Sequence, residues 1–359
     1  MRLTILSVGF PFAPVSACTA GGAEQILATL DKFLTLTGHA SIVLAPEGSQ
    51  VSGLLIPTPK VPADISSDFQ TYVRDIVRSL LRHTIRHFRV DVVHLHGLDF
   101  LDYLPAVDVP VIVTLHLPLS WYPKELFSIS RAKTKFVCVS KTQLQSWPDD
   151  LRNEECEVIE NGVDLADFRP REKKGDYLLY IGRICPEKAP HLALEAAEEA
   201  GMPLYFAGAV FGYESHRLYF EKMIAPRLRG EHKLIGQVGG GRKRDLFDGA
   251  RCLLIPSLAP ETSSLVAMEA FACGTPVIAF RSGALAHLIE HGKTGFLVNT
   301  VDEMAQSVRR VHELDPTECR RRAEASFSAD GMAHQYLASY ERLATQAFEL
   351  DRGVLCPAS

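Results

Sequence analysis

Runs of consecutive apolar residues alternate along the chain with segments in which apolar residues recur every three or four positions. In the first half, the apolar runs cover residues 3–8, 40–45, 111–116 and 136–140. Such runs are typical of parallel strands buried on both faces. Helical spacing follows the first run, with Ile26, Leu30 and Phe33 on one face, and returns over residues 72–88. This half therefore predicts helices alternating with the strands of a parallel sheet.

The same alternation restarts in the second half. Strand-like runs cover residues 177–181, 204–207, 234–238 and 252–255, and helical patterns cover 191–200, the residues after 264, and 329–350. An Asn161-Gly162 turn signal and the charged, proline-containing segment 168–174 indicate a passage between the halves. Residues 48–68 are punctuated by prolines and are predicted to form a loop. A chain of 359 residues is long enough for about two such domains.

Composition excludes several classes of protein. The net charge of −5 argues against a general nucleic-acid binder. The eight cysteines are scattered singly, without metal-site spacing, as expected of reduced thiols in a cytoplasmic protein. No apolar run approaches the length of about 20 residues that a membrane span needs. The one basic stripe, Arg74, Arg78, Arg82 and Arg86 on the predicted helix 72–88, fits a solvated face better than a weak contact with a membrane surface or an anionic acceptor.

Candidate chemistry gathers just after the predicted strands, where ligands bind in α/β folds. Gly21 and Gly22 follow the first strand, and Arg183 and Lys188 follow the strand 177–181. Glycines let the backbone approach a phosphate closely, and the two cations are placed to hold a diphosphate. Taken alone, the glycines could serve only a turn and the cations could be exposed loop residues.

The stretch 256–274 carries the most specific pattern. Glu261 and Glu269 flank Ser263, Ser264 and Leu265, where a helix is predicted to begin. A helix N-terminus offers free N–H groups to an anion. A carboxylate on each side of an anion site suits a nucleotide sugar, whose hydroxyls flank a diphosphate. Two isolated glutamates would more commonly be surface charges.

Three histidines complete the set of candidates. His94 and His96 share one face of a predicted strand that ends in a glycine turn, and His116 ends the strand 111–116. The first two could suggest a metal pair, but no third ligand is apparent nearby in the sequence. Packed histidines in a core or a cleft are the commoner arrangement.

The order of these motifs resembles the retaining glycosyltransferases of family 4. The resemblance is carried by the two glutamates, by Cys273-Gly274-Thr275-Pro276-Val277-Ile278, by Arg281-Ser282-Gly283, and by the tail from Ile289 to Val298. It implies the GT-B fold: an α/β protein with two Rossmann-like parallel-sheet domains facing a central cleft, and a C-terminal helix crossing back to the first domain. The implied domains are 1–163, completed by about 335–359, and 164–334.

The resemblance also assigns roles to residues. His116 would lie near the donor sugar, and Gly21 and Gly22 would close over the diphosphate. Arg183 and Lys188, with the backbone at Ser263, Ser264 and Leu265, would bind that diphosphate. Glu261 would orient the sugar hydroxyls, and Glu269 would bind the ribose. The chain departs from the family at Ala189, at Thr262-Ser263-Ser264, and at Ala286-His287.

The reaction implied is transfer of a sugar from a nucleoside-diphosphate sugar, with a UDP-sugar favoured and GDP and ADP donors open. The sequence has no Asp-x-Asp motif, so we expect neither a metal ion nor another cofactor. The acceptor, whether saccharide, lipid-linked or small molecule, is not specified, and loops 48–70 and 97–130 are expected to select it. An epimerase or hydrolase of sugar nucleotides and a non-catalytic nucleotide-sugar-binding protein are the alternatives.

Overall fold

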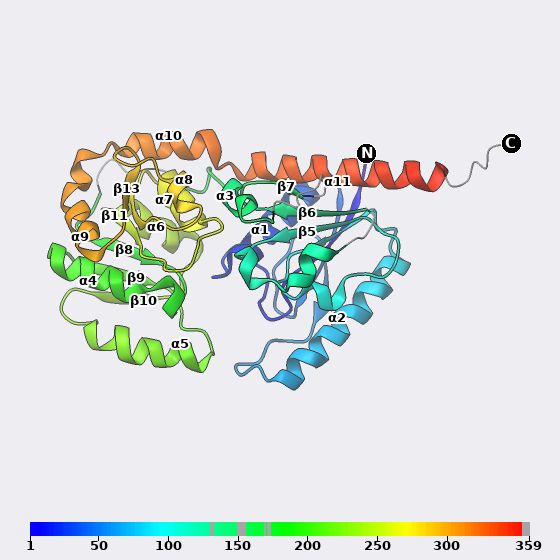
Figure 1. The fold of residues 1–359 in the computed structure, drawn as a ribbon, viewed down its shortest axis with the longest axis horizontal. Helices are drawn as coiled ribbons and strands as arrows, with labels where there is room; N and C mark the ends of the chain where they lie inside the picture. The colour runs from blue at the N-terminus through cyan, green and yellow to red at the C-terminus, as the bar shows by residue number, and fades with distance from the viewer. Residues whose placement is uncertain (130–132, 149–155, 169, 171–173, 354–359) are drawn as a thin grey trace. The chain divides into compact units, whose positions relative to one another are not determined.

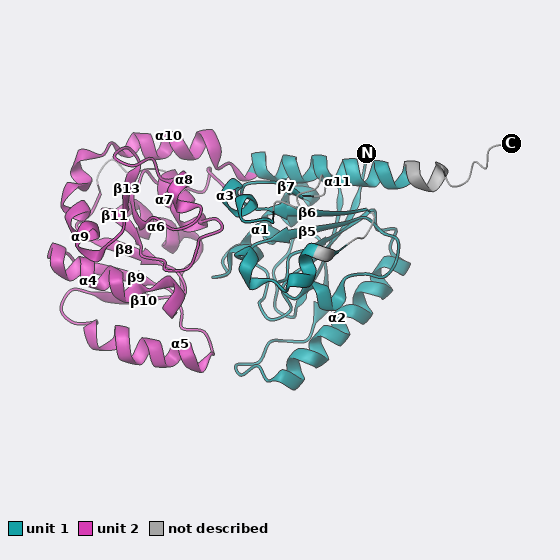
Figure 2. Ribbon diagram, in the orientation of Figure 1, with its two compact units in different colours: residues 1–160, 330–359 teal, residues 161–329 magenta. Residues whose placement is uncertain are grey.

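The chain forms two compact units. The computed structural model describes all residues except 130–132, 149–155, 169, 171–173 and 354–359. Unit 1 comprises residues 1–160 and 330–359, and unit 2 comprises residues 161–329 (Figure 2). The boundaries expected from the sequence, after 163 and after 334, lie three and five residues from these. Much of the predicted linker 168–174 falls outside the described residues.

Unit 1 is built on a parallel sheet of seven strands (Figure 1). The strands are β1 (Thr4–Val8), β2 (Ala40–Pro46), β3 (Leu54–Thr58), β4 (Val92–Leu95), β5 (Val111–Leu115), β6 (Thr134–Cys138) and β7 (Cys156–Val158). Their order across the sheet is β3-β2-β1-β4-β5-β6-β7. The order reverses between β1 and β4, and ligands bind at such a switch point in open α/β sheets.

Strand β3 corrects the prediction that residues 48–68 form only a loop. The strand includes Pro57 and pairs with β2 in parallel register. Proline cannot donate a ladder hydrogen bond, so it is tolerated mainly in edge strands, and β3 is at the edge of the sheet. The prolines favour a loop, but a proline is also compatible with a strand at the edge of a sheet.

The helices of unit 1 are α1 (Gly22–Leu36), α2 (Ser67–His87), α3 (Lys141–Gln145) and α11 (Ala329–Gly353), with short 3-10 turns at Phe100–Tyr103, Leu119–Trp121 and Lys124–Ser128. Helix α2 begins five residues before the predicted start because the Ser66 hydroxyl caps it by accepting the N–H of Phe69. Of its basic stripe, Arg74 is paired with Asp99 at 3.0 Å and Arg78 with Asp75 at 2.7 Å. Among the described residues, no helix is both long and apolar enough to cross a bilayer.

The long C-terminal helix α11 packs on the sheet of unit 1. All residues of this helix except the first, Ala329, belong to unit 1. The hydroxyl of Tyr340 lies 2.7 Å from Nδ1 of His94, and that of Tyr336 lies 3.0 Å from the hydroxyl of Thr114. Nε2 of His94 in turn contacts the Thr114 hydroxyl at 2.7 Å. These four buried side chains form one hydrogen-bonded network between α11 and the strands β4 and β5.

Unit 2 repeats the architecture with a six-stranded parallel sheet in the order β10-β9-β8-β11-β12-β13. The strands are β8 (Leu178–Ile181), β9 (Leu204–Ala207), β10 (Lys233–Gly236), β11 (Cys252–Ile255), β12 (Val277–Phe280) and β13 (Gly295–Val298). The helices are α4 (Pro190–Ala200), α5 (Glu214–Tyr219), α6 (Gly240–Gly249), α7 (Leu265–Ala272), α8 (Leu285–Leu288), α9 (Val301–Arg310) and α10 (Pro316–Ser326). Short turns lie at Pro186–Lys188, Phe220–Ile224, Ala225–Arg227 and Val311–Glu313.

Alternate residues of the unit 2 strands enter two separate cores. Leu179 and Leu253 point into a core that includes helix α7, whereas Leu178 and Leu254 point into a core that includes helix α4. A sheet covered on both faces explains the continuous apolar runs of the sequence. The sheet order reverses between β8 and β11, which lie side by side, so the loops after these two strands share one edge of the sheet.

Candidate donor-binding site

The loops after β8 and β11 bring together a predicted cation and a predicted carboxylate. Nζ of Lys188 donates to Oε1 of Glu261 across 2.6 Å, and the Ser257 hydroxyl donates to the same oxygen. Glu261 is only 8% exposed. Its backbone is fixed as well, because its carbonyl oxygen accepts the N–H of Ala284 at 2.7 Å. Sequence analysis assigned these two residues to different parts of a ligand, and the structure pairs them with each other.

The glycine of the Arg281-Ser282-Gly283 turn has a steric role in holding Glu261. Gly283 adopts φ of +53°, and a Cβ atom there would lie 2.2 Å from the carbonyl oxygen of Glu261. Any residue other than glycine would therefore be strained and would also push against the loop that carries the carboxylate.

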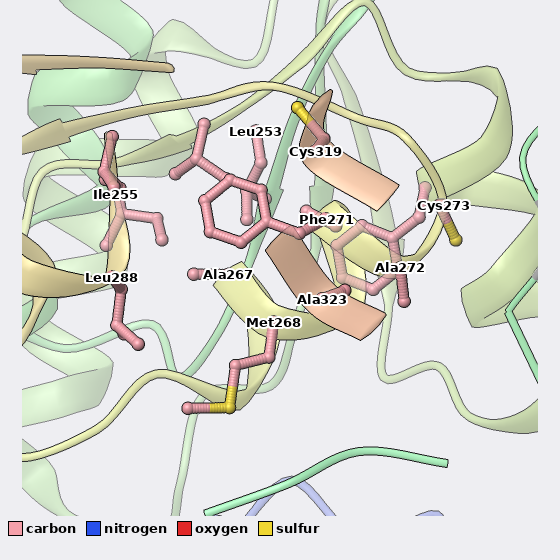
Figure 3. Close-up of a cluster of buried hydrophobic side chains, with 14 of the residues drawn as sticks. Leu253, Ile255, Ala267, Met268, Phe271, Ala272, Cys273, Leu288, Cys319 and Ala323 are labelled. Atoms are coloured by element: carbon pink, nitrogen blue, oxygen red, sulfur yellow. The ribbon is translucent and has the colours of Figure 1, made fainter. Parts of the chain in front are cut away.

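The second glutamate is held inside the apolar core by helix α7. Figure 3 shows Ala267 and Phe271 of this helix among Leu253 and Ile255 of β11, with residues of α10 alongside. Helix α7 buries side chains on nearly all of its surface, so Glu269, at 5% exposure, stands in an apolar environment. This burial raises the pKa of Glu269, and Lys243 opposes the rise.

Lys243, in the basic run Arg242-Lys243-Arg244 at the start of α6, is the partner of Glu269. Its Nζ lies 2.5 Å from Oε1 of Glu269, and its side chain is 12% exposed. The other carboxylate oxygen of Glu269, Oε2, is buried without a hydrogen-bond partner among the described residues. A buried oxygen that the protein leaves unsatisfied can accept a hydroxyl of a bound molecule.

The N-terminus of α7 lies between the two glutamates in the sequence. Ser264 is its N-cap residue in extended conformation, but no side chain caps the helix. The hydroxyl of Ser263 is buried and has no hydrogen-bond partner among the described atoms. The first N–H groups of a helix lack intrahelical acceptors, so the backbone at Ser264 and Leu265 can offer donors next to the unpartnered Ser263 hydroxyl. These donors and the helix dipole suit an anion.

Arg183 follows β8 and carries the remaining predicted cation. Its Nη1 lies 3.3 Å from Oε1 of Glu187, and its guanidinium lies over the ring of Phe211 at 5.9 Å. Ala189, where the resemblance expects glycine, adopts φ of +46°. The left-handed conformation explains the expectation of glycine, since alanine there costs about 1–2 kcal/mol.

The predicted glycines of unit 1 follow β1, which borders the switch point of its sheet. Gly22 is the first residue of α1, and Gly21 is its N-cap residue. A Cβ atom at Gly21 would lie 1.8 Å from the carboxylate of Glu24, which is buried over the first turn of the helix. The glycine thus leaves room for a buried acid that sequence analysis did not single out.

His116 follows β5 and belongs to a row of three histidines. Its Nε2 lies 3.0 Å from Nδ1 of His96, and the two rings are stacked. The ring of His96 lies 3.8 Å, centroid to centroid, from that of His94. Burial lowers the pKa of His116 to about 3 and holds those of the other two well below the usual range, so all three rings are neutral at neutral pH.

Comparison with known families matches both halves of the chain. The family described as "Glycosyltransferase Family 4" matches residues 20–167, and the family described as "Glycosyl transferases group 1" matches residues 165–327. The second match contains all the paired charges of unit 2 described above.

Individual relatives span most of the chain. Glycogen synthase of Mycobacterium tuberculosis is 27% identical over an alignment of 380 residues, which covers 90% of this chain and 89% of that protein. Among solved structures, sucrose-phosphate synthase of Thermosynechococcus elongatus superposes with a TM-score of 0.80 at 20% identity, covering 96% of this chain and all of that one.

HepE of Anabaena, solved in complex with UDP-glucose, gives a TM-score of 0.76 at 17% identity over 95% of this chain and 100% of that one. The sheet orders of the two units and these superpositions show the GT-B fold, and the matches to the two families show the activity class. The chain therefore belongs to the group 1 glycosyltransferases of family 4 and is a glycosyltransferase.

Proposed function

We propose that the protein transfers a sugar from a UDP-sugar to an acceptor hydroxyl, with retention of anomeric configuration and without a metal ion. The observation that supports this most strongly is the arrangement at α7. Two buried carboxylates, Glu261 and Glu269, flank in sequence a helix N-terminus that no side chain caps, and each is paired with a lysine. A ligand with hydroxyls at both ends and an anion in the middle matches this arrangement.

The sugar nucleotide supplies these groups in the required order. In the proposed complex, Glu269 accepts the ribose hydroxyls through its unsatisfied Oε2, and Glu261 accepts hydroxyls of the donor sugar. Arg183, Lys188 and the N–H groups at Ser263 to Leu265 receive the diphosphate. HepE, which shares the fold, is known with UDP-glucose bound, and this supports uridine as the base.

The chemical step releases a diphosphate whose charge grows as the bond to the sugar breaks. Fixed cations and helix N–H groups aimed at that charge stabilise the transition state without reorganisation. The acceptor hydroxyl attacks from the same face as the departing phosphate, which takes the hydroxyl proton. In this proposal no protein nucleophile is needed. For Gly21, Gly22 and the neutral ring of His116, which belong to unit 1, the proposal keeps the roles that the family resemblance implies.

The deciding experiment incubates the chelator-treated protein with UDP-, GDP- and ADP-glucose and a panel of sugar, polyol and lipid-linked acceptors. We expect mass spectrometry to find a glycosylated acceptor from UDP-glucose, and NMR to find an α-linkage from the α-linked donor. Release of free sugar or an epimerised donor without transfer would establish one of the alternative activities. Loss of transfer on chelation, restored by magnesium or manganese, would contradict metal independence.

A further inference from the structure

A second cluster of ligating side chains lies in the loops after β8 and β9 of unit 2. The sulfur of Cys185, a carboxylate oxygen of Glu187 and a ring nitrogen of His216 all lie within 4.8 Å of one another. Cys185 and Glu187 lie at and within the short turn Pro186–Lys188, and His216 lies in helix α5. We propose that these three side chains bind a thiophilic divalent cation of the zinc class.

The geometry is close to that of a bound ion. Zinc takes ligands at about 2.0–2.3 Å in a tetrahedron, which places them about 3.3–3.8 Å from each other. The observed limit of 4.8 Å therefore requires movements of only about 1 Å. One thiolate, one imidazole and one carboxylate are a ligand set that favours zinc over magnesium or calcium, which prefer oxygen.

The burial of the side chains and an unpartnered ligand atom also support a metal site. Cys185 is fully buried, and His216 is 8% exposed. Nδ1 of His216 is buried without a hydrogen-bond partner among the described residues. The Cys185 sulfur already lies against the Glu187 carboxylate, and its contact with the Arg183 carbonyl at 3.8 Å contributes little.

Binding requires the thiolate. The incoming ion takes the sulfur lone pair as the S–H proton leaves to solvent. The two negative ligands then balance the charge of the ion, and the fourth position takes water.

Glu187 connects this cluster to the proposed donor site. The same carboxylate that faces the cluster is paired with Arg183 at 3.3 Å. An ion on Glu187 therefore competes with Arg183 for that carboxylate. The ion has no part in the proposed transfer, so its binding is measured apart from activity.

The test titrates the chelator-treated, metal-free protein with Co²⁺, which reports thiolate ligation by a sulfur-to-cobalt charge-transfer absorption. We expect one equivalent to produce this absorption together with the intense visible bands of a four-coordinate ion, and Zn²⁺ to displace it. Cys185→Ser should abolish the charge-transfer absorption. The matched control Cys18→Ser removes an exposed thiol in unit 1 and should leave it unchanged.

A second variant guards against loss of folding at the buried cysteine. His216→Ala, on a short surface helix, should weaken Co²⁺ binding at least about tenfold, since even indirect supports of a metal ligand are worth that much. The exposed His312→Ala should bind as the unchanged protein does. Absence of a thiolate absorption at stoichiometric Co²⁺, its survival in Cys185→Ser, or equal affinity in the two histidine variants would overturn the proposal.

Discussion

Each of three cations in the region of the proposed donor site is paired with a carboxylate: Arg183 with Glu187, Lys188 with Glu261, and Lys243 with Glu269. The last two pairs are the more buried, and removing one member of a buried pair leaves the other charge unsatisfied. Variants of these residues therefore change both the ligand contacts and the partner, and their design has to separate the two.

Arg183→Ala is the cleaner test of diphosphate binding, because its partner Glu187 retains access to solvent. We expect Arg183→Ala and Lys188→Ala each to weaken donor binding tenfold or more, since a charge-assisted contact is worth about 1.5–3 kcal/mol. Calorimetry with UDP measures this. Arg244→Ala is the control, since its pair with Asp167 at 2.9 Å is more exposed. Unchanged UDP affinity in both test variants would exclude their role.

The two glutamates should differ in what they lose. Glu269→Ala should weaken binding of free UDP, because its partners are on the ribose. Glu261→Ala should bind UDP almost normally and lose turnover, since a contact with the reacting sugar acts in the transition state. The assignment of ends is wrong if calorimetry finds equal losses of UDP affinity in the two variants.

Glu269 should also make the free energy of unfolding depend on pH. Burial raises its folded-state pKa above the ordinary value of 4.5, so the folded protein holds this proton more tightly than the unfolded chain. Its contribution to stability therefore falls as pH rises from 4.5 towards the folded pKa. Denaturant unfolding of the unchanged protein and of Glu269→Gln at several pH values should show their difference shifting in this direction. A difference independent of pH would contradict it.

Sequence reasoning singled out the two glutamates and two of the three paired cations, Arg183 and Lys188, but not Lys243. Three consecutive basic residues at a helix start give no sign of which one points inward, and only the packing of α6 against α7 decides it. The Cys185, Glu187 and His216 cluster escaped for a related reason. Its members are separated by a strand and a helix, so their proximity depends on the sheet order.

At the scale of elements, the candidate site residues of unit 2 lie mainly in or next to loops between strands and helices. Glycine turns such as the one at Gly283 pack against these loops. The sequence predicted nine of the thirteen described strands and did not single out β3, β7, β12 and β13, of which all but β12 are at the edge of a sheet. A strand buried on both faces leaves the clearer apolar signal. Edge strand β3 carries a proline and mixed burial, and its pattern is that of a loop. The turn after β12 shows how a single backbone position governs a functional side chain.

Gly283→Ala should disturb the loop of Glu261 through both strain and overlap. Gly292 provides the matched control, because it also has positive φ, at +77°, but nothing lies within 4 Å of the added methyl group. We expect Gly292→Ala to lose about 1 kcal/mol of stability from strain alone, and Gly283→Ala to lose more, about 2–3 kcal/mol, together with turnover. Chemical unfolding and a donor-turnover assay measure the two effects. Equal losses in the two variants would show that the overlap is relieved.

At the scale of the whole molecule, the chain leaves unit 1 after residue 160 and returns to it with α11. Periodicity predicted the helix, but its membership of unit 1 followed only from the family resemblance. The anchoring partners His94 and Thr114 are more than 200 residues away in the sequence. No local pattern encodes contacts at that separation, and the structure alone shows the network.

Tyr340→Phe tests this anchor. It removes the partner of the buried Nδ1 of His94, so we expect unit 1 to lose about 1–3 kcal/mol of stability. UDP binding, for which the proposal relies mainly on Arg183, Lys188 and Glu269 of unit 2, should persist. Unfolding followed by circular dichroism and UDP calorimetry give the two readings. Tyr72→Phe, at an exposed tyrosine, should unfold as the unchanged protein does. Equal stability of the two variants would show that the network contributes nothing.

The three ion pairs that Arg183, Lys188 and Lys243 form with glutamates should affect how fast and how selectively the protein binds a nucleotide. A site whose cations are neutralised by neighbouring carboxylates has little net charge, so it gives little electrostatic steering of an approaching anion. Association with a nucleotide should then depend weakly on ionic strength. Inorganic phosphate or sulfate, which could meet the cations but offers no hydroxyls to the freed carboxylates, should compete poorly. We therefore expect the ion pairs to disfavour the binding of small inorganic anions. A ligand that offers phosphate oxygens to the cations and hydroxyls to the carboxylates should replace both halves of each pair.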